Sequence, residues 1–230
     1  MLKARKKITR KELKHDPLMD TIYKFRQFWG IHQTNISRYG GIILVALVLS
    51  VLVIRWRSTQ DEKARAVTGI AFIEFGSGNY NTVISQLAPV VDEYSGLKSF
   101  GSGLFLLARS ELFVGDTVNA ELHFQLFLDE YGQIPLLKCG AYGGLGIIAE
   151  SRKEYIAAAR LFESATLTAR EKSSQVRYAI LAGRNFLLAD APEETIKLLN
   201  PFLEIENLDF QAASKIKALI TAAELKAQRG

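Results

Sequence analysis

The sequence predicts an all-α protein in which one transmembrane helix precedes a soluble array of helical hairpins. Three observations indicate this fold class: an uncharged apolar run over residues 40–54, helical periodicity beyond it with almost no strand pattern, and a fourfold repeat of 37–38 residues. We therefore expect a basic leader over 1–38, a transmembrane helix over 39–57, four repeats over 58–207 and a capping helix over 208–230.

The leader and the rest of the chain differ in charge. Residues 1–38 carry ten Lys or Arg against three acidic side chains, whereas residues 58–230 carry 17 against 21, a net charge of −4. The overall charge of +5 therefore describes the leader, and the soluble part has no basic stripe that would indicate nucleic-acid binding. Residues 3–14 are too polar for a core and predict a disordered tail or frayed helix at the membrane surface.

Residues 19–36 mix aromatic, apolar and basic side chains near helical spacing. Two interpretations stay open. The segment lies in the membrane interface as an amphipathic helix, or it extends the transmembrane helix into the cytoplasm with a break at Gly30.

The apolar run reaches about 18 residues with Tyr39 and Trp56, the lower end of what spans a bilayer. A cleaved signal peptide fits poorly, because the basic region is long and the first A-x-A motif after the run, at residues 64–66, lies well beyond it. A buried core helix also fits poorly, because the run is apolar on all sides and Arg38, Arg55 and Arg57 flank it.

The excess of Lys and Arg before the run predicts orientation. Such residues stay on the cytoplasmic side, so the N-terminus is expected in the cytoplasm and residues 58–230 on the exported side. We expect a single-pass protein of a bacterial inner membrane with its C-terminal domain in the periplasm.

The repeat is marked by four turn triplets, which begin at Gly78, Gly115, Lys153 and Asp190. A small residue stands seven positions before each triplet, and two further positions recur after it. The three sets are Ala71, Ala108, Gly146 and Gly183; Val83, Ala120, Ala158 and Thr195; and Leu87, Phe124, Phe162 and Leu199.

Each recurring position has a physical role. The small residues allow two helices of a hairpin to approach closely, and Gly78 and Gly115 supply a positive φ in the turn. Phe124 and Phe162 are expected to fill the wedge between neighbouring hairpins, which must stack to bury their apolar faces. Asp209 is the expected N-cap of the last helix.

This pattern resembles the tetratricopeptide repeat, most closely over LFLLARSELFVGDTVNAELHFQLFLDEY at residues 104–131. The resemblance implies a right-handed solenoid of helical hairpins. The leader, the single membrane helix, the Arg-Trp-Arg exit at residues 55–57 and the degenerate repeats together resemble the YfgM-like family of ancillary SecYEG translocon subunits. That family resemblance implies an inner-membrane protein beside the export channel, with exported chains and periplasmic chaperones as partners, and no catalysis.

Residues typical of catalysis do not gather in the sequence. His15, His32 and His123 are scattered, and Cys139 is interpreted as a packing residue. The glycine-rich segment GAYGGLG at residues 140–146 lacks the Lys-Ser/Thr of a phosphate loop and follows no strand, which favours close helix packing. We predict no catalytic residue, metal, cofactor, small-molecule substrate or nucleic-acid partner.

The resemblance implies a binding groove lined by the first helix of each hairpin. The candidate groove residues are Phe72, Phe105, Arg109, Ile147 and Arg184. The apolar side chains would supply contact area and the arginines would pair with carboxylates of a partner. The alternative is that many of these side chains pack against neighbouring helices.

These observations predict a membrane-anchored interaction protein that recruits export or folding partners near the translocon on the periplasmic side. The alternative is a structural tether of another envelope assembly, such as cell-wall, division or outer-membrane machinery. An enzyme is the third and least supported interpretation.

Overall fold

The computed structural model describes residues 17–205 and 208–228, and the predicted tail over residues 3–14 lies outside them. Throughout the described residues the regular secondary structure is helical, which confirms the predicted all-α class. The α-helices are α1 (Pro17–Gly76), α2 (Tyr80–Leu87), α3 (Val91–Tyr94), α4 (Gly101–Val114), α5 (Thr117–Tyr131), α6 (Pro135–Ser151), α7 (Tyr155–Thr168), α8 (Lys172–Leu188), α9 (Pro192–Leu203) and α10 (Phe210–Ala227). Two short 3₁₀ helices, Ala88–Val90 and Lys98–Phe100, flank α3.

The chain divides into two compact units, Met1–Ser58 and Thr59–Gly230, and the boundary falls inside α1. In the first unit, the rings of Phe25 and Trp29 lie 6.2 Å apart and those of Phe28 and His32 lie 4.5 Å apart, so aromatic groups gather along the helix. The helix continues through Gly30. The break that one interpretation placed there is therefore absent.

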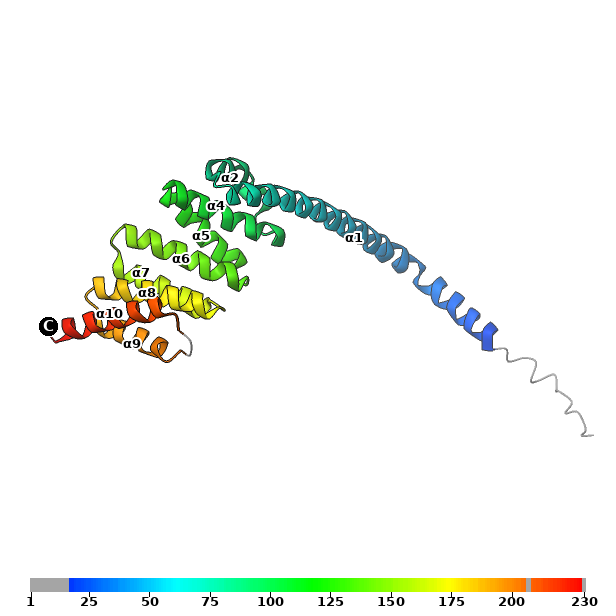
Figure 1. The fold of residues 1–230 in the computed structure, drawn as a ribbon. Coiled ribbons are helices and arrows are strands. Elements are labelled where there is room, and N and C mark those ends of the chain that lie inside the picture. Colours follow the sequence, from blue (N-terminus) through cyan, green and yellow to red (C-terminus); the bar gives the residue numbers. More distant parts are fainter. Residues whose placement is uncertain (1–16, 206–207, 229–230) are drawn as a thin grey trace, which may run out of the picture. The chain divides into compact units, whose positions relative to one another are not determined.

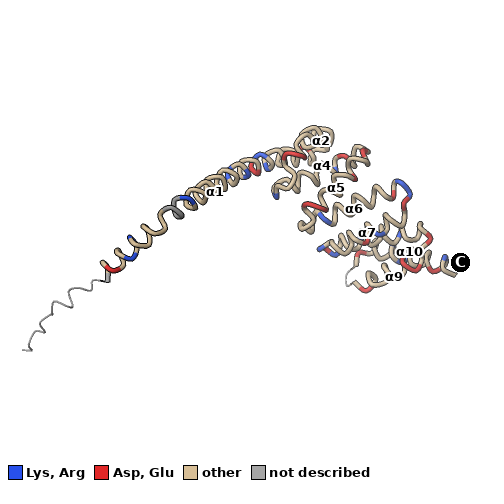
Figure 2. The backbone as a smooth tube through the Cα atoms, turned by 180° about the vertical axis from the view of Figure 1, so that it is seen from behind, with Lys and Arg blue, Asp and Glu red and all other residues tan. Residues whose placement is uncertain are grey.

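Within the described residues, α1 is the one helix long and apolar enough to cross a membrane. Its most apolar window lies within Arg38–Gly76, and no part of that window is buried by the rest of the chain. Figure 2 shows an uncharged part of α1, which in the sequence lies between Arg38 and Arg55. A core helix of a soluble protein would be mostly buried, so the exposed window disagrees with that alternative.

The second unit is a series of antiparallel helical hairpins, which follow one another in chain order (Figure 1). Residues 59–76 of α1 share a buried apolar cluster with α2 and α3, and the pairs α4/α5, α6/α7 and α8/α9 follow. The last helix, α10, packs against both α9 and α8. The buried apolar residues form three clusters along the array: one from α1 to α6, one in α6, α7 and α8, and one shared by α8, α9 and α10.

The four hairpin turns share one backbone geometry. Gly78, Gly115, Lys153 and Asp190 all have a positive φ, of 81°, 86°, 62° and 61°. In each turn the next residue donates its N–H to the carbonyl five residues earlier, from Asn79 to Glu74, Asp116 to Glu111, Glu154 to Ala149 and Ala191 to Phe186, at 2.9–3.0 Å. This is the Schellman ending of a helix, which explains why the triplets align although only two of them begin with glycine.

The recurring positions of the repeat are buried. Its four small residues and all eight residues at the two later positions are inaccessible or nearly so: Ala71, Ala108, Gly146, Gly183, Val83, Ala120, Ala158, Thr195, Leu87, Phe124, Phe162 and Leu199. A methyl group on Gly146 would lie 2.7 Å from the ring of Phe162, and one on Gly183 would lie 2.6 Å from Leu199. The small residues thus allow the close approach within each hairpin that the spacing predicts.

Glycines 140–146 serve helix packing, as the sequence indicates. Phe124 of the second hairpin lies directly over Gly144 of the third, where a side chain would collide with its ring. Phe124 therefore fills the wedge between neighbouring hairpins, whereas Phe162 closes against Gly146 of its own hairpin. Asp209 caps α10 as predicted, because its Oδ2 accepts the N–H of Ala212 at 3.0 Å.

Candidate functional site

The first helices of the hairpins form one layer, which we call the first-helix layer: residues 59–76 of α1, then α4, α6, α8 and α10. Neighbouring members touch through small residues. A methyl group on Gly140 of α6 would lie 2.7 Å from the ring of Phe105 on α4, and one on Gly143 of α6 would lie 2.6 Å from Tyr178 on α8. These contacts leave little room between α4, α6 and α8.

Phe105, a predicted groove residue, belongs to the core. Its ring centroid lies 6.0 Å from that of Phe124 and 5.5 Å from that of Phe127, and Gly140 covers it from the next hairpin. Only 7% of the residue is exposed. A partner on the layer would therefore gain almost no contact area from Phe105, and here the alternative of packing between helices describes the residue better.

Arg109 is half-buried in a cluster of aromatic rings. Its guanidinium carbon lies 4.8 Å from the ring centroid of Phe75, 5.7 Å from that of Phe105 and 5.6 Å from that of Phe113. Tyr80 stacks on Phe113 at 4.6 Å and completes the cluster. The arginine thus contributes cation–π contacts between the first two hairpins, in addition to any role toward a partner.

The other three predicted residues lie at the surface. Phe72 and Ile147 are exposed, and Arg184 is exposed with its Nη2 2.6 Å from Oε1 of Glu150. This ion pair links α8 to α6 across the first-helix layer. The sequence pattern predicts that the five residues line one layer. Of the five, the structure brings only Phe105 and Arg109 into contact with each other.

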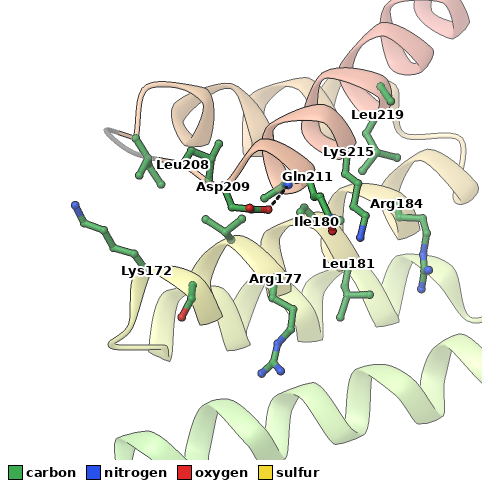
Figure 3. Close-up of a pocket in the computed structure, with 15 residues that line it drawn as sticks. Lys172, Arg177, Ile180, Leu181, Arg184, Leu208, Asp209, Gln211, Lys215 and Leu219 are labelled. Carbon is green, nitrogen blue, oxygen red and sulfur yellow. Dashed lines mark hydrogen bonds between the residues drawn. The ribbon is translucent and has the colours of Figure 1, made fainter.

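A groove lies between α8 and α10, with a volume of about 840 Å³, and we call it the α8–α10 groove (Figure 3). Its floor consists of buried and half-buried apolar side chains from both helices and the preceding loop: Val176, Ile180, Leu181, Leu208 and Leu219. The floor continues into the core that α8 shares with α9 and α10. The groove is therefore a part of that core left uncovered by the described residues.

Positive side chains surround this apolar floor. Lys172, Arg177 and Arg184 come from α8 and Lys215 comes from α10, while the acidic side chain of the lining is Asp209, whose carboxylate caps α10. Figure 3 shows Arg177 and Arg184 extending to the same side of α8 and Lys215 standing on the opposite wall. No described carboxylate forms an ion pair with Lys172, Arg177 or Lys215.

Sequence reasoning found only Arg184 of the groove's charged residues. A signal was available for the α8 wall, because Arg177, Ile180 and Arg184 recur at spacings of three and four, which place them on one helix face. The contribution of α10 had no such signal. Lys215 enters the groove because α10 packs along α8, and only tertiary contacts determine that placement.

Two buried ionisable groups, Tyr178 on α8 and Cys139 on α6, lie near Arg177. Burial raises the pKa of the Tyr178 hydroxyl and of the Cys139 thiol, and the nearby guanidinium of Arg177 opposes both shifts. Both groups stay protonated near neutral pH and add no negative charge to the groove. Among residues 17–205 and 208–228, no group of three or more His, Cys, Asp or Glu side chains is arranged to hold a metal ion.

The fold and the groove define an all-helical array of hairpins that carries one candidate membrane span and an uncovered apolar groove with a positive rim. Comparisons with family models, with curated proteins and with solved structures give no match for this chain.

Proposed function

We propose that this chain is a single-pass membrane protein of the tetratricopeptide class, whose array holds segments of partner proteins. The single observation that carries the proposal is the α8–α10 groove, an apolar surface of the first-helix layer that no described residue covers. Exposed apolar concavities of this kind are typical of peptide-binding surfaces. Peptide recognition by a groove between helices needs no catalytic group, and we assign the chain none.

Three features support the assignment to the tetratricopeptide class and the right-handed solenoid that this class implies. They are the shared Schellman turns, the 37–38-residue period and, in the third and fourth hairpins, a glycine of the first helix against a large residue of the second. A hairpin with these contacts leaves an apolar face for its neighbour, so the array grows by stacking. The capping helix α10 then covers the last face and supplies one wall of the groove.

Membrane attachment gives the array its location. The proposal places α1 across a bacterial inner membrane with the basic leader in the cytoplasm and the array in the periplasm, on the basis of the charge difference between the leader and the array. The layout of leader, span and repeats further supports a position near the protein-export translocon, where newly exported chains and periplasmic chaperones are the partners.

Site-specific photo-crosslinking in intact cells tests this function without destabilising the fold. A photoreactive amino acid replaces exposed Ile147 or Lys215 on the first-helix layer, and exposed Leu167 on α7 serves as the matched position on a second helix. We expect protein adducts from the first two positions and none from Leu167.

The identity of the adducts decides the rest. Translocon subunits, exported chains or chaperones support the export role. Adducts consisting of cell-wall, division or outer-membrane components would replace the export role with that of an envelope tether. Equal labelling from all three positions would show that the first-helix layer is not a specific binding surface and that the array acts as a spacer.

A further inference from the structure

The α8–α10 groove is positive within an acidic domain. Residues 58–230 carry a net charge of −4, yet the groove brings together four Lys or Arg and one Asp. Arg184 is already paired with Glu150, and Asp209 is engaged as the N-cap of α10. Lys172, Arg177 and Lys215 remain without a carboxylate partner among the described residues, so the groove favours an anionic ligand.

The shape of the groove limits what that ligand is. Its α8 wall runs from Lys172 to Arg184, about 18 Å at the rise of an α-helix, which matches about three helical turns. The floor is apolar in the middle of this wall, at Val176, Ile180 and Leu181 on α8, and at Leu219 on α10. A ligand that satisfies both floor and rim carries an apolar face with negative groups beside it.

We propose that the α8–α10 groove binds a short amphipathic helix of a partner protein, with aliphatic side chains on one face and Asp or Glu beside them. This inference rests on the proposed function of the array as a protein-binding surface and names the chemistry of the segment. The aliphatic face would lie on Ile180, Leu181 and Leu219, and the carboxylates would pair with Arg177 and Lys215 from the two walls.

An anionic membrane surface fits the same groove less well. Membrane recognition by charge uses clusters of four to eight basic residues, whereas Asp209 lies in this lining, Glu150 pairs with the rim residue Arg184, and the domain as a whole is acidic. The domain's net charge of −4 would repel an anionic bilayer. The volume of about 840 Å³ between two helices suits side chains that enter it.

The test measures binding of labelled helical peptides to the full-length chain in neutral detergent micelles. The probe has roughly 14 residues, or four turns, with Leu on one face and Glu beside it. One twin peptide carries Lys in place of every Glu, and a second carries Ser in place of every Leu. The protein variants are Lys215→Glu in the groove and Lys217→Glu, an exposed residue of the same helix that does not line it.

We expect the Leu/Glu peptide to bind the unaltered chain and both twins to bind at least about ten-fold more weakly. Lys215→Glu should weaken the Leu/Glu peptide by about ten-fold and Lys217→Glu by less than about two-fold, because only Lys215 faces the groove. Helix content measured by circular dichroism should match in both variants.

Equal weakening by both variants, or equal binding of the Glu and Lys peptides, would overturn the proposal. So would phosphatidylglycerol vesicles that bind the chain in a Lys215-dependent manner while the peptide does not. If the peptides fail but Ile147 and Lys215 still crosslink to proteins in cells, the proposed function stands and only the acidic-helix chemistry is wrong. If crosslinking also fails, both are wrong.

Discussion

Nδ1 of His123 on α5 donates a hydrogen bond of 2.7 Å to Oε2 of Glu111 on α4, inside the second hairpin. The side chain of Glu111 is only 3% exposed and that of His123 is 13% exposed. A carboxylate in this position depends on its one described partner, because removal of that partner would leave a buried charge without compensation.

The first prediction concerns this pair. His123→Ala should lower the free energy of unfolding of the second unit by about 3 kcal/mol, because Glu111 loses its hydrogen bond in a buried site. The double substitution Glu111→Met/His123→Leu should cost less, since it removes both polar groups and keeps their volume. Urea unfolding of the full-length chain in micelles measures both values, and a single variant as stable as the double would contradict the prediction.

The second prediction compares two helical glycines. Gly144→Ala should destabilise the array by about 1–3 kcal/mol, because the new methyl group collides with the ring of Phe124 from the neighbouring hairpin. Gly69→Ala should instead stabilise it by about 0.5–1 kcal/mol, since nothing lies within 4 Å of that position and alanine favours the helix. Thermal unfolding of the two variants should therefore shift in opposite directions, and a shared direction would argue against the close packing of α5 on α6.

The third prediction concerns the two turns that lack glycine. Lys153 and Asp190 adopt a left-handed backbone, with φ of 62° and 61°, that costs other residues more than glycine. Lys153→Gly and Asp190→Gly should each raise the free energy of unfolding by up to about 1 kcal/mol. Lys197→Gly, at an exposed position within α9, is the control and should lower it by a similar amount. Denaturation midpoints provide the comparison.

The fourth prediction is a pH dependence at the N-cap of α5. The side-chain amide of Asn119 and then its backbone N–H hold the pKa of Asp116 below its ordinary value of 3.8. Because the pKa is lower in the folded chain, this ionised carboxylate stabilises the fold above pH 3.8, and the stabilisation disappears as the pH falls through the folded-state value.

Asp116→Asn keeps a capping side chain but removes the titration. The variant should match the unaltered chain near pH 7 and lose less stability on acidification below about pH 4. Acid titrations followed by circular dichroism measure the difference. Parallel acid-unfolding curves would show that Asp116 titrates normally in the folded chain.

The fifth prediction concerns topology. Alkaline phosphatase is active only after export, so a fusion after Gly230 should be active and a fusion that ends at Arg38, before the apolar run, should be inactive. The leader should also remain attached to the chain, with no cleavage after the apolar run. A cleaved N-terminus near Ala66, or activity of the Arg38 fusion alone, would refute the uncleaved cytoplasm-to-periplasm orientation.

The groove was less accessible to sequence reasoning than the fold. Phe105, three positions before Ala108, and Ile147, one position after Gly146, are both predicted groove residues, but Phe105 is buried under Gly140 whereas Ile147 is 48% exposed. The repeat pattern assigns both positions to the first-helix layer and does not say which of them a neighbouring hairpin covers. The burial of Phe105 depends on its contact with Gly140 of the next hairpin, which a pattern within one repeat does not contain.

The sequence by itself determined the features that depend on neighbours along the chain. The uncharged run of residues 40–54 defines the candidate span, and the 37–38-residue period locates the four turns and the buried small residues, because these follow from local hydrophobicity, backbone preference and helical spacing. Only the tertiary structure decided that Glu111 is buried beside His123, and that Lys215 of α10 stands across a groove from Arg177 of α8. Those relationships arise from how separate helices pack, and the packing distances depend on side chains far apart in the chain.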